Sequence, residues 1–351
     1  MAASQKTKLA GQIDHRDTCP SRALTIGIVN NMPDAAFDAT TRRLLSLVHA
    51  GAEGLPIEVR GYRLPHLGTE QASPSSPLLR YEDLHALYDE PPDALFVTGA
   101  RPTVTDITLE PFWGDLAKLI RWACERVPST LLSCLASHAA AVALHGIERI
   151  PLLSKRCGVF EQEVDRSHFL MRRLGASVSL PHSRFNDISS EDLLRHGYDI
   201  LVASADSGWT VATREESGRL LVLLQGHPEY SPTTLLREYR RDVNEYLQGT
   251  ASDYPEIPVG YLDRAGEERL LALRRVHQCA QPVVEVSPFP FRPMCSYIRA
   301  DWQDTASQLF ANWVIDAGRR SGLDHGSETD GERERNDLAT SEDDDRHNVS
   351  P

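Results

Sequence analysis

The stretch "STLLSCLASHAAAVALHGI", residues 129–147, places one cysteine between two runs of different character. The short apolar run before Cys134 is typical of a buried strand, and the alanine-rich run after it is typical of a helix. A residue at such a turn projects above the sheet, beside the free amides and positive dipole end of the helix. These surroundings favour a thiolate, so Cys134 is a candidate nucleophile. This segment alone is equally compatible with a small residue packed at a turn.

The segments around this stretch show the same alternation. Apolar, β-branched runs predict strands at 23–33, 56–64, 94–100 and 219–225, the last reached through a turn around "EESG". Helical spacing of apolar residues predicts helices at 38–50 and 111–127. This order predicts an α/β fold with a doubly wound, mostly parallel sheet, in which ligands bind at the carboxyl ends of the strands.

Three of the predicted strand ends carry Gly99, Cys134 and His227. His227 begins the run "HPEY", in which Pro228 fixes the backbone so that Glu229 can reach the far nitrogen of the imidazole. A carboxylate in that position orients a histidine and stabilises its protonated form. We therefore predict that Cys134, His227 and Glu229 form one catalytic site. The backbone N–H of Leu135 is then placed to bind an oxyanion.

Other residues with reactive side chains have simpler interpretations. His138 lies one helical turn after Cys134 but has no orienting carboxylate nearby in sequence, so we do not expect it to be the base. Cys124 falls on the apolar face of its helix and is expected to be a core residue. The six cysteines form no CxxC pair, and no glycine-rich phosphate loop is present, so we expect no disulfide framework, no metal site and no bound cofactor.

Composition limits the classes of function and suggests the domain boundaries. With 41% hydrophobic residues the chain can bury a sizeable core, and a net charge of −13 argues against nucleic acid as a partner. No signal peptide or membrane-spanning run is present, so a cytoplasmic location and no membrane partner are expected. We expect a flexible N-terminus at 1–22, one domain at 23–317 and a disordered acidic tail at 318–351, where apolar residues are scarce.

Beyond these single features, seven stretches resemble one known family in the family's own order. They are "IGIVNNMPD", "FVTGA", "LLSC", "CGVFEQEV", "PHSRFND", "GHPEYSPTTLLREYRRD" and "QLFANWV", between about residues 25 and 315. A cysteine at a strand elbow with "HPE" is similar to the class I glutamine amidotransferases. The longer stretches resemble the homoserine O-acyltransferase branch of that superfamily, the O-succinyltransferases and O-acetyltransferases of methionine biosynthesis. The resemblance implies a flavodoxin-like fold with a C-terminal elaboration.

The resemblance also implies a mechanism and its substrates. Cys134 would attack an acyl-CoA thioester, and the acyl group would then pass to the hydroxyl of homoserine. His227 would act as the base in both steps, with Glu229 orienting it. Acyl-CoA would be a co-substrate, no other cofactor would be needed, and the enzyme would be a homodimer.

Further site residues are implied by positions that match the family. The backbone N–H of Ala100 would join that of Leu135 in the oxyanion hole. Lys155 and Ser183 would contact the acyl group or the substrate, and Arg241 would bind the carboxylate of the amino acid, which suits a bidentate guanidinium. Taken without the resemblance, Lys155, Arg184 and Arg241 are each better explained as solvated surface charges.

Several departures from the family pattern bear on specificity. After "TGA" the family has proline, whereas this chain has Arg101, and Thr103 stands near the position that separates succinyl users, with glycine, from acetyl users, with glutamate. Because no glutamate occurs there and Arg101 could attract a carboxylate, we expect a succinyl donor. Leu135 replaces the usual tryptophan after the nucleophile, and "WQDTASQLFANW" departs from the family's Trp-Arg-Ser-His run. An acyltransferase for serine or another hydroxy amino acid is therefore an alternative.

Two other classes of function stay open. A glutamine amidase or other thiol hydrolase would use the same scaffold, although the Gly-x-Cys-x-Gly elbow of typical amidotransferases is missing. A catalytically silent relative that only binds a metabolite would not need all three catalytic groups. The segment 262–280, "LDRAGEERLLALRRVHQCA", has helical character and no function that we can derive from sequence.

Overall fold

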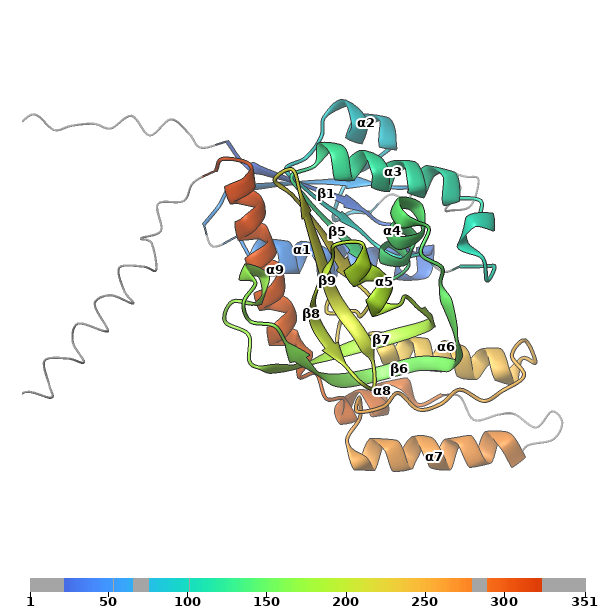
Figure 1. Cartoon of the computed structure of the whole chain (residues 1–351). Coiled ribbons are helices and arrows are strands. Elements are labelled where there is room, and N and C mark those ends of the chain that lie inside the picture. The colour runs from blue at the N-terminus through green and yellow to red at the C-terminus, as the bar shows by residue number, and fades with distance from the viewer. Residues whose placement is uncertain (1–21, 53, 66–75, 101, 280–288, 324–351) are drawn as a thin grey trace, which may run out of the picture.

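The centre of the molecule is a twisted sheet, seen in the computed structural model, which describes residues 22–52, 54–65, 76–100, 102–279 and 289–323. In the described part of the chain the strands are β1 (Leu24–Val29), β2 (Ile57–Tyr62), β3 (Tyr81–Glu82), β4 (Ala94–Val97), β5 (Ser129–Ser133), β6 (Ile150–Val164), β7 (Ser177–Asp187), β8 (Asp199–Ser204), β9 (Gly208–Glu216) and β10 (Arg219–Leu224). Their order across the sheet is β3-β2-β1-β4-β5-β10-β9-β8-β6-β7 (Figure 1).

The sheet changes direction halfway across. From β3 to β10 every neighbouring pair is parallel, and from β10 through β9, β8, β6 and β7 every pair is antiparallel. The parallel half reverses its order between β1 and β4, which is the topological switch point of a doubly wound sheet. The predicted fold class is therefore confirmed, and the antiparallel half is an extension of it.

Helices cover both faces of the sheet. They are α1 (Asp34–Ala50), α2 (Leu84–Asp89), α3 (Trp113–Arg126), α4 (Leu135–His145), α5 (Ser190–Arg195), α6 (Thr234–Leu247), α7 (Arg264–Cys279), α8 (Phe291–Met294) and α9 (Trp302–Arg320), with short 3-10 turns at Ile107–Leu109, Phe169–Met171 and Cys295–Tyr297. None of the helices within the described ranges is long and apolar enough to cross a membrane.

Alternation along the strands creates two cores. In β4, Ala94 and Phe96 point into the core shared with α1, α6 and α9, whereas Leu95 and Val97 point into the core shared with α2, α3, α4 and α5. Such double-sided burial explains the continuous apolar runs in the sequence. Cys124 packs against the second of these cores, as predicted, and burial raises the pKa of its thiol to about 11.

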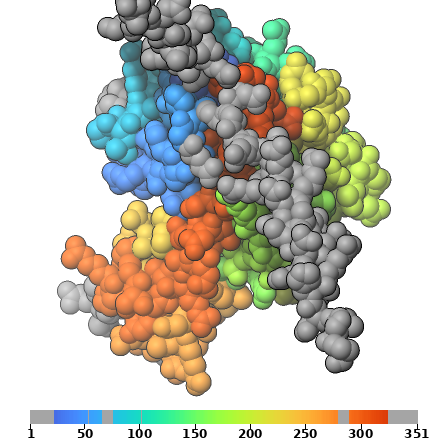
Figure 2. All heavy atoms as spheres, turned by 90° about the vertical axis from the view of Figure 1, so that its left-hand side faces the viewer, coloured from blue at the N-terminus to red at the C-terminus, as the bar shows by residue number. Residues whose placement is uncertain are grey.

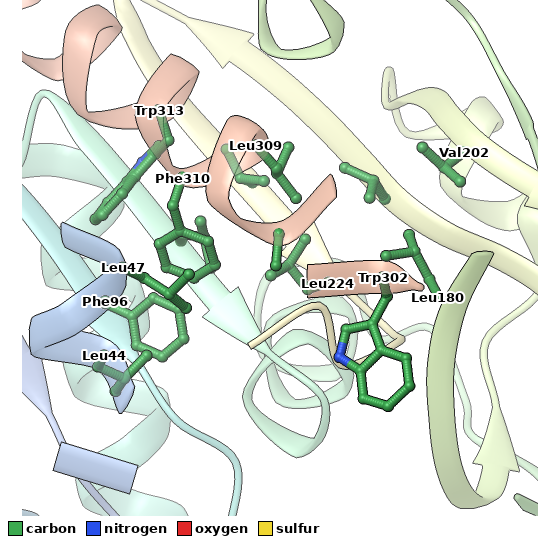
Figure 3. Close-up of a cluster of buried hydrophobic side chains, with 14 of the residues drawn as sticks. Leu44, Leu47, Phe96, Leu180, Val202, Leu224, Trp302, Leu309, Phe310 and Trp313 are labelled. Atoms are coloured by element: carbon green, nitrogen blue, oxygen red, sulfur yellow. The ribbon is translucent and has the colours of Figure 1, made fainter. Parts of the chain in front are cut away.

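The last helix, α9, closes the first core (Figure 3). Its Phe310 ring lies 5.7 Å from that of Phe96, and the indole N–H of Trp313 donates to the hydroxyl of Ser129 at 2.9 Å. The helix continues to Arg320, so the predicted start of the acidic tail at 318 is wrong. Gly318 is buried and Arg320 pairs with Asp316, which holds this turn in the helix. The rest of that tail and residues 1–21 lie outside the described residues.

The C-terminal elaboration forms an appendage at one end of the molecule. It contains α7 and α8, coloured orange at the lower end in Figure 2, and α7 confirms the helical character predicted for this segment. The backbone at Val259, which precedes α7, lies against Gly158 of β6. A Cβ atom on Gly158 would lie 2.4 Å from the carbonyl oxygen of Val259. Only glycine fits there.

The long pair β6 and β7 is the element that sequence analysis did not identify. Residue Cys157 pairs with Ser183 and Arg156 with Arg184, and the register shifts between Pro151 and Arg156. The two strands are rich in polar residues and lack the apolar runs of the parallel strands, so their pattern is weak. This pair carries several residues to the site described below.

Candidate active site

Cys134 occupies a sharp turn between β5 and α4. Its φ of +49° and ψ of −109° lie in a region that residues other than glycine rarely adopt. The N–H of Cys134 donates to the carbonyl oxygen of Leu224 in β10 at 2.6 Å, and Leu135 begins α4. A strained backbone at a strand-to-helix turn is the arrangement that exposes a nucleophile at the top of a sheet.

His227 lies just beyond the end of β10, the strand next to β5. Its ring Nδ1 lies 2.9 Å from Oε1 of Glu229, and its backbone N–H donates to the carbonyl oxygen of Pro181 at 2.7 Å. Because a carboxylate only accepts, Nδ1 carries the proton and Nε2 is left free to take another. Nε2 is buried and has no hydrogen-bond partner of ordinary geometry among the described residues.

The thiol and the imidazole are close enough to affect each other. Burial by itself lowers the pKa of His227, but the negative charges of Cys134 and Glu229, and hydrogen bonds to both, hold this pKa well above its usual value. The Cys134 thiol influences the imidazole, yet Nε2 has no hydrogen bond of ordinary geometry. Both observations hold when the sulfur faces Nε2 just outside the limits of a hydrogen bond. The structure thus places Glu229 against His227 and His227 within electrostatic reach of Cys134, and the catalytic role of the three stays a prediction.

Three residues that sequence analysis did not single out support His227 and Glu229. The hydroxyl of Ser133 donates to Oε1 of Glu229 at 2.7 Å, and Nε of Arg43 in α1 donates to the carbonyl oxygen of Glu229 at 3.2 Å. The ring of Tyr230 stacks on that of His227, with centroids 4.0 Å apart. Tyr230 was within reach of sequence reasoning, because it completes the run "HPEY".

The predicted oxyanion hole lies where β4 meets the start of α4. A Cβ atom on Gly99 would lie 3.2 Å from the backbone nitrogen of Leu135, so the loop after β4 packs directly on the elbow. The N–H of Leu135 opens α4 and has no acceptor within the helix. Ala100 is the next residue of the same loop, so the geometry is compatible with both predicted N–H donors.

A second cluster surrounds Glu238 of α6. Its Oε1 accepts from the hydroxyl of Tyr230 at 2.6 Å, its Oε2 accepts from the hydroxyl of Ser183, and Oε2 lies 3.5 Å from Nζ of Lys155. Burial alone raises the pKa of Glu238, but Lys155 and the hydrogen bonds from Ser183 and Tyr230 outweigh it and lower this pKa. Tyr230 thus joins this cluster to His227, and Glu238 is a residue that sequence analysis missed.

The predicted substrate-binding residues all border this cluster. Nζ of Lys155 lies 2.7 Å from Oδ2 of Asp242, and Arg241 makes an ion pair of 2.7 Å with Oδ1 of the same carboxylate. The Lys155 side chain is 15% exposed and that of Arg241 is 41% exposed, so only Arg241 faces solvent to a large extent. For Lys155, the structure excludes the interpretation as a solvated surface charge.

The loop after β4 was predicted to select the acyl group. Thr103 is exposed, and both its N–H and its hydroxyl donate to the carboxylate of Glu110, the hydroxyl at 3.0 Å. The sequence has no glutamate at the selector position, but the fold brings the buried Glu110 to Thr103 from seven residues away. Arg101 lies outside the described residues.

His138 has the surroundings of a residue that supports the fold and not of a catalytic base. It is buried, its Nε2 lies 2.9 Å from Oε1 of Gln225, and burial lowers its pKa to about 3. A histidine that stays neutral and bonded to a buried amide is a poor base. Within the described ranges, no three His, Cys, Asp or Glu side chains are arranged to hold a metal ion.

Comparisons with known proteins show which family this chain resembles. The family model described as homoserine O-succinyltransferase matches residues 12–317. A curated protein of that name from Rhodopseudomonas palustris is 37% identical over 84% of this chain and 88% of its own length. Another from Methylorubrum extorquens is 38% identical over 84% and 87%. Among solved structures, a glutamine amidotransferase from Thermotoga maritima covers 85% of this chain and 98% of its own, at 12% identity and a TM-score of 0.48.

Proposed function

The chain belongs to the homoserine O-succinyltransferase family and is an acyltransferase, and we propose that it transfers a succinyl group from succinyl-CoA to the hydroxyl of homoserine through an acyl-enzyme on Cys134. This reaction is a step of methionine biosynthesis. No cofactor beyond the CoA of the donor takes part. The arrangement that supports the proposal is the imidazole of His227 held between the Cys134 thiol and the Glu229 carboxylate.

The first half of the reaction acylates the enzyme. The thiol proton of Cys134 resides on Nε2 of His227 as a thiolate–imidazolium pair, and the thiolate sulfur attacks the thioester carbonyl of the donor. The N–H groups of Leu135 and Ala100 stabilise the negative oxygen that forms. The carbon–sulfur bond to CoA then breaks, and the CoA thiolate takes the proton from His227.

The second half transfers the acyl group to the acceptor. Nε2 of His227 removes the proton of the homoserine hydroxyl, whose oxygen attacks the acyl-enzyme carbonyl. The carbon–oxygen bond forms, the bond to Cys134 breaks, and the thiol regains its proton from the imidazolium. Glu229 keeps the ring in the tautomer that both halves require, because its Oε1 accepts the Nδ1 proton.

The cluster around Glu238 suits the amino-acid end of homoserine. Arg241 offers a guanidinium to the substrate carboxylate, and the carboxylates of Glu238 and Asp242 can receive its ammonium group. Lys155 and Ser183 hold Glu238 in place for this contact. Because Tyr230 bonds Glu238 and stacks on His227, an amino acid bound here has its side-chain hydroxyl close to the base.

Mass spectrometry after exposure to an acyl donor tests this mechanism. Incubation with succinyl-CoA should add one succinyl group to Cys134 and release CoA thiol, and later addition of homoserine should remove the group as O-succinylhomoserine. The variant Cys134→Ala should form no adduct and should lose turnover by at least about 10⁴-fold, with the fold intact by circular dichroism.

Other functions predict different results in the same assay. Discharge of the adduct by serine but not by homoserine would replace the acceptor. Release of ammonia from glutamine, without acylation by either succinyl-CoA or acetyl-CoA, would identify a glutamine amidase. No adduct and no ammonia would leave a binding protein, and the proposal would then be rejected.

A further inference from the structure

Two arginine side chains near Cys134 have no role in the chemistry described so far. Arg149 immediately precedes β6, and Arg184 lies within β7. Arg184 is only 4% exposed, and Arg149 is half-buried. In each of them the guanidinium Nε is buried and has no hydrogen-bond partner among the described residues.

A chain of contacts links the segments that carry both arginines to the start of α4, the helix that follows Cys134. Ile150, next to Arg149, pairs with Asp187, which is three residues from Arg184. The adjacent N–H of Ile188 lies 3.3 Å from Oε1 of Gln225, the same atom that contacts His138. His138 in turn donates its backbone N–H to the carbonyl oxygen of Cys134 at 3.1 Å.

Electrostatics agree with this placement. Burial lowers the pKa of Arg149, and the negative charges of Cys134, Asp106 and Glu110, in decreasing order, oppose it. Burial also lowers the pKa of Arg184, and there Asp187 and Cys134 oppose it. Both guanidinium groups are therefore within electrostatic reach of the nucleophilic sulfur.

Three arginines lie at this end of the site, and only one carboxylate forms ion pairs with them. Arg184 and Arg156 both pair with the one carboxylate of Asp187, at 3.1 and 3.2 Å. Arg149 donates to the carbonyl oxygen of Thr105 at 3.2 Å and has no carboxylate within ion-pair distance in the described part of the chain. The carboxylates of Asp106 and Glu110 lie close enough to influence Arg149, but neither makes an ion pair with it among the described residues. Its guanidinium can therefore still pair with an anion that a ligand brings.

We propose that Arg149, supported by Arg184, binds the free carboxylate of the acyl group and so selects donors made from a dicarboxylic acid. The inference rests on the proposed function, in which Cys134 receives that acyl group. In a succinyl thioester two methylene groups separate the carboxylate from the reacting carbonyl, so its partner must lie beside the nucleophile. Guanidinium groups match carboxylates in charge and shape.

A competing role for Arg149 is to stabilise the Cys134 thiolate directly. That role would influence every acyl donor equally, because the thiolate attacks them all. A carboxylate-binding role influences only donors that carry the second carboxylate. Comparison of succinyl-CoA with acetyl-CoA therefore separates the two roles.

The test measures the rate at which Cys134 is acylated, by mass spectrometry, in the full chain without homoserine. In Arg149→Ala, acylation by succinyl-CoA should slow by at least tenfold and by about 100-fold if the charged hydrogen bond is fully lost. Acylation by acetyl-CoA should change less than about threefold. Arg149→Lys keeps the charge without the planar fork and should fall between Arg149→Ala and the unaltered protein with succinyl-CoA.

Arg121→Ala is the matched control, because Arg121 also donates to a single backbone carbonyl, that of Ala143, on the surface. It should leave both acylation rates unchanged, and thermal melting should show that all variants fold. Equal slowing of both donors in Arg149→Ala, or no slowing, overturns the inference while the proposed function stands. Acylation of the unaltered protein by acetyl-CoA alone also overturns it. If neither donor acylates Cys134, the proposed function itself fails, and this inference fails with it.

Discussion

At the scale of single residues, the site depends on local geometry that costs stability. Cys134 adopts a positive φ, which costs of the order of 1–3 kcal/mol for a residue other than glycine. The hydrogen bond from its backbone N–H to Leu224 and the packing of Gly99 against Leu135 hold the turn in this conformation. The proximity of His227 and Glu229 was predictable because both follow a strand and lie two residues apart in "HPE", and their catalytic roles with Cys134 stay predictions.

The pKa of His227 leads to a prediction at this scale. Glu229→Gln removes one of the two negative charges that raise this pKa, so the imidazolium should be lost at lower pH than in the unaltered protein. As pH rises above the ordinary histidine value of about 6.5, the unaltered protein keeps its imidazolium and the variant loses it. Since the imidazolium favours the thiolate, alkylation of Cys134 by iodoacetamide in this range should slow by about tenfold in the variant.

Ser133→Ala serves as the control for this experiment. It removes one hydrogen bond to Oε1 of Glu229 but keeps the carboxylate charge. Its pH profile should lie close to that of the unaltered protein, with alkylation rates within about threefold. Identical profiles for Glu229→Gln and the unaltered protein would show that Glu229 does not control the protonation of His227.

At the scale of elements, helices that cover the sheet fix the positions of the strand ends. Helix α1 supplies Arg43 to Glu229, and α9 packs beside α1 in the same core. At the end of α1, a Cβ atom on Gly51 would lie 2.7 Å from Cα of Ala311 in α9. The two helices therefore approach so closely that this position requires a residue without a side chain.

This close approach predicts opposite effects for two glycine substitutions. Gly51→Ala should force the helices apart and lower the free energy of unfolding by about 1–3 kcal/mol. Gly114→Ala, in α3, meets no atom within 4 Å and should raise it by up to about 1 kcal/mol, because alanine favours helix. Urea unfolding followed by circular dichroism measures both. If Gly51→Ala were as stable as Gly114→Ala, the packing of α1 on α9 would have to differ from that described.

At the scale of the whole molecule, the site is assembled from two halves of one sheet. The parallel half supplies Cys134 and His227 at adjacent strand ends, and the antiparallel extension supplies Lys155, Ser183 and Arg184 from β6 and β7. Helix α6, which follows His227 in the chain, brings Glu238 between them. The proposed chemistry thus belongs to the parallel half, and the contacts proposed for the substrates come largely from the extension.

This division predicts that acceptor binding can be impaired separately from acylation. Glu238→Gln should raise the KM for homoserine by about 10- to 100-fold, because the ammonium group loses a charged partner. Acylation of Cys134 by succinyl-CoA should change less than about threefold, since Glu238 does not contact the nucleophile. Steady-state kinetics and the mass-spectrometric acylation rate report the two steps.

Glu256→Gln is the control, because Glu256 pairs with Arg274 on the surface, where its side chain is 72% exposed. It should change neither step. A parallel loss of acylation and transfer in Glu238→Gln would mean that this carboxylate supports the catalytic residues and does not bind the acceptor.

The sequence by itself determined the succession of parallel strands and helices along the chain. Strands buried on both faces are continuous apolar runs, and these are visible in the sequence. It also identified Cys134, His227 and Glu229, since strand ends and the short spacing of "HPE" are local features. It predicted that 262–280 is helical, but it placed the start of the acidic tail inside α9, where Arg320 pairs with the nearby Asp316 and with the distant Glu215.

Only the tertiary structure decided which distant groups meet. The pairing of β6 with β7 and the contact of Glu238 with Lys155 and Ser183 join residues far apart in the chain and carry no local signal. Polar strands have no hydrophobic period strong enough to fix their partners. A charged side chain has the same appearance in sequence whether water or a buried carboxylate surrounds it, and the fold alone settles that difference for Lys155.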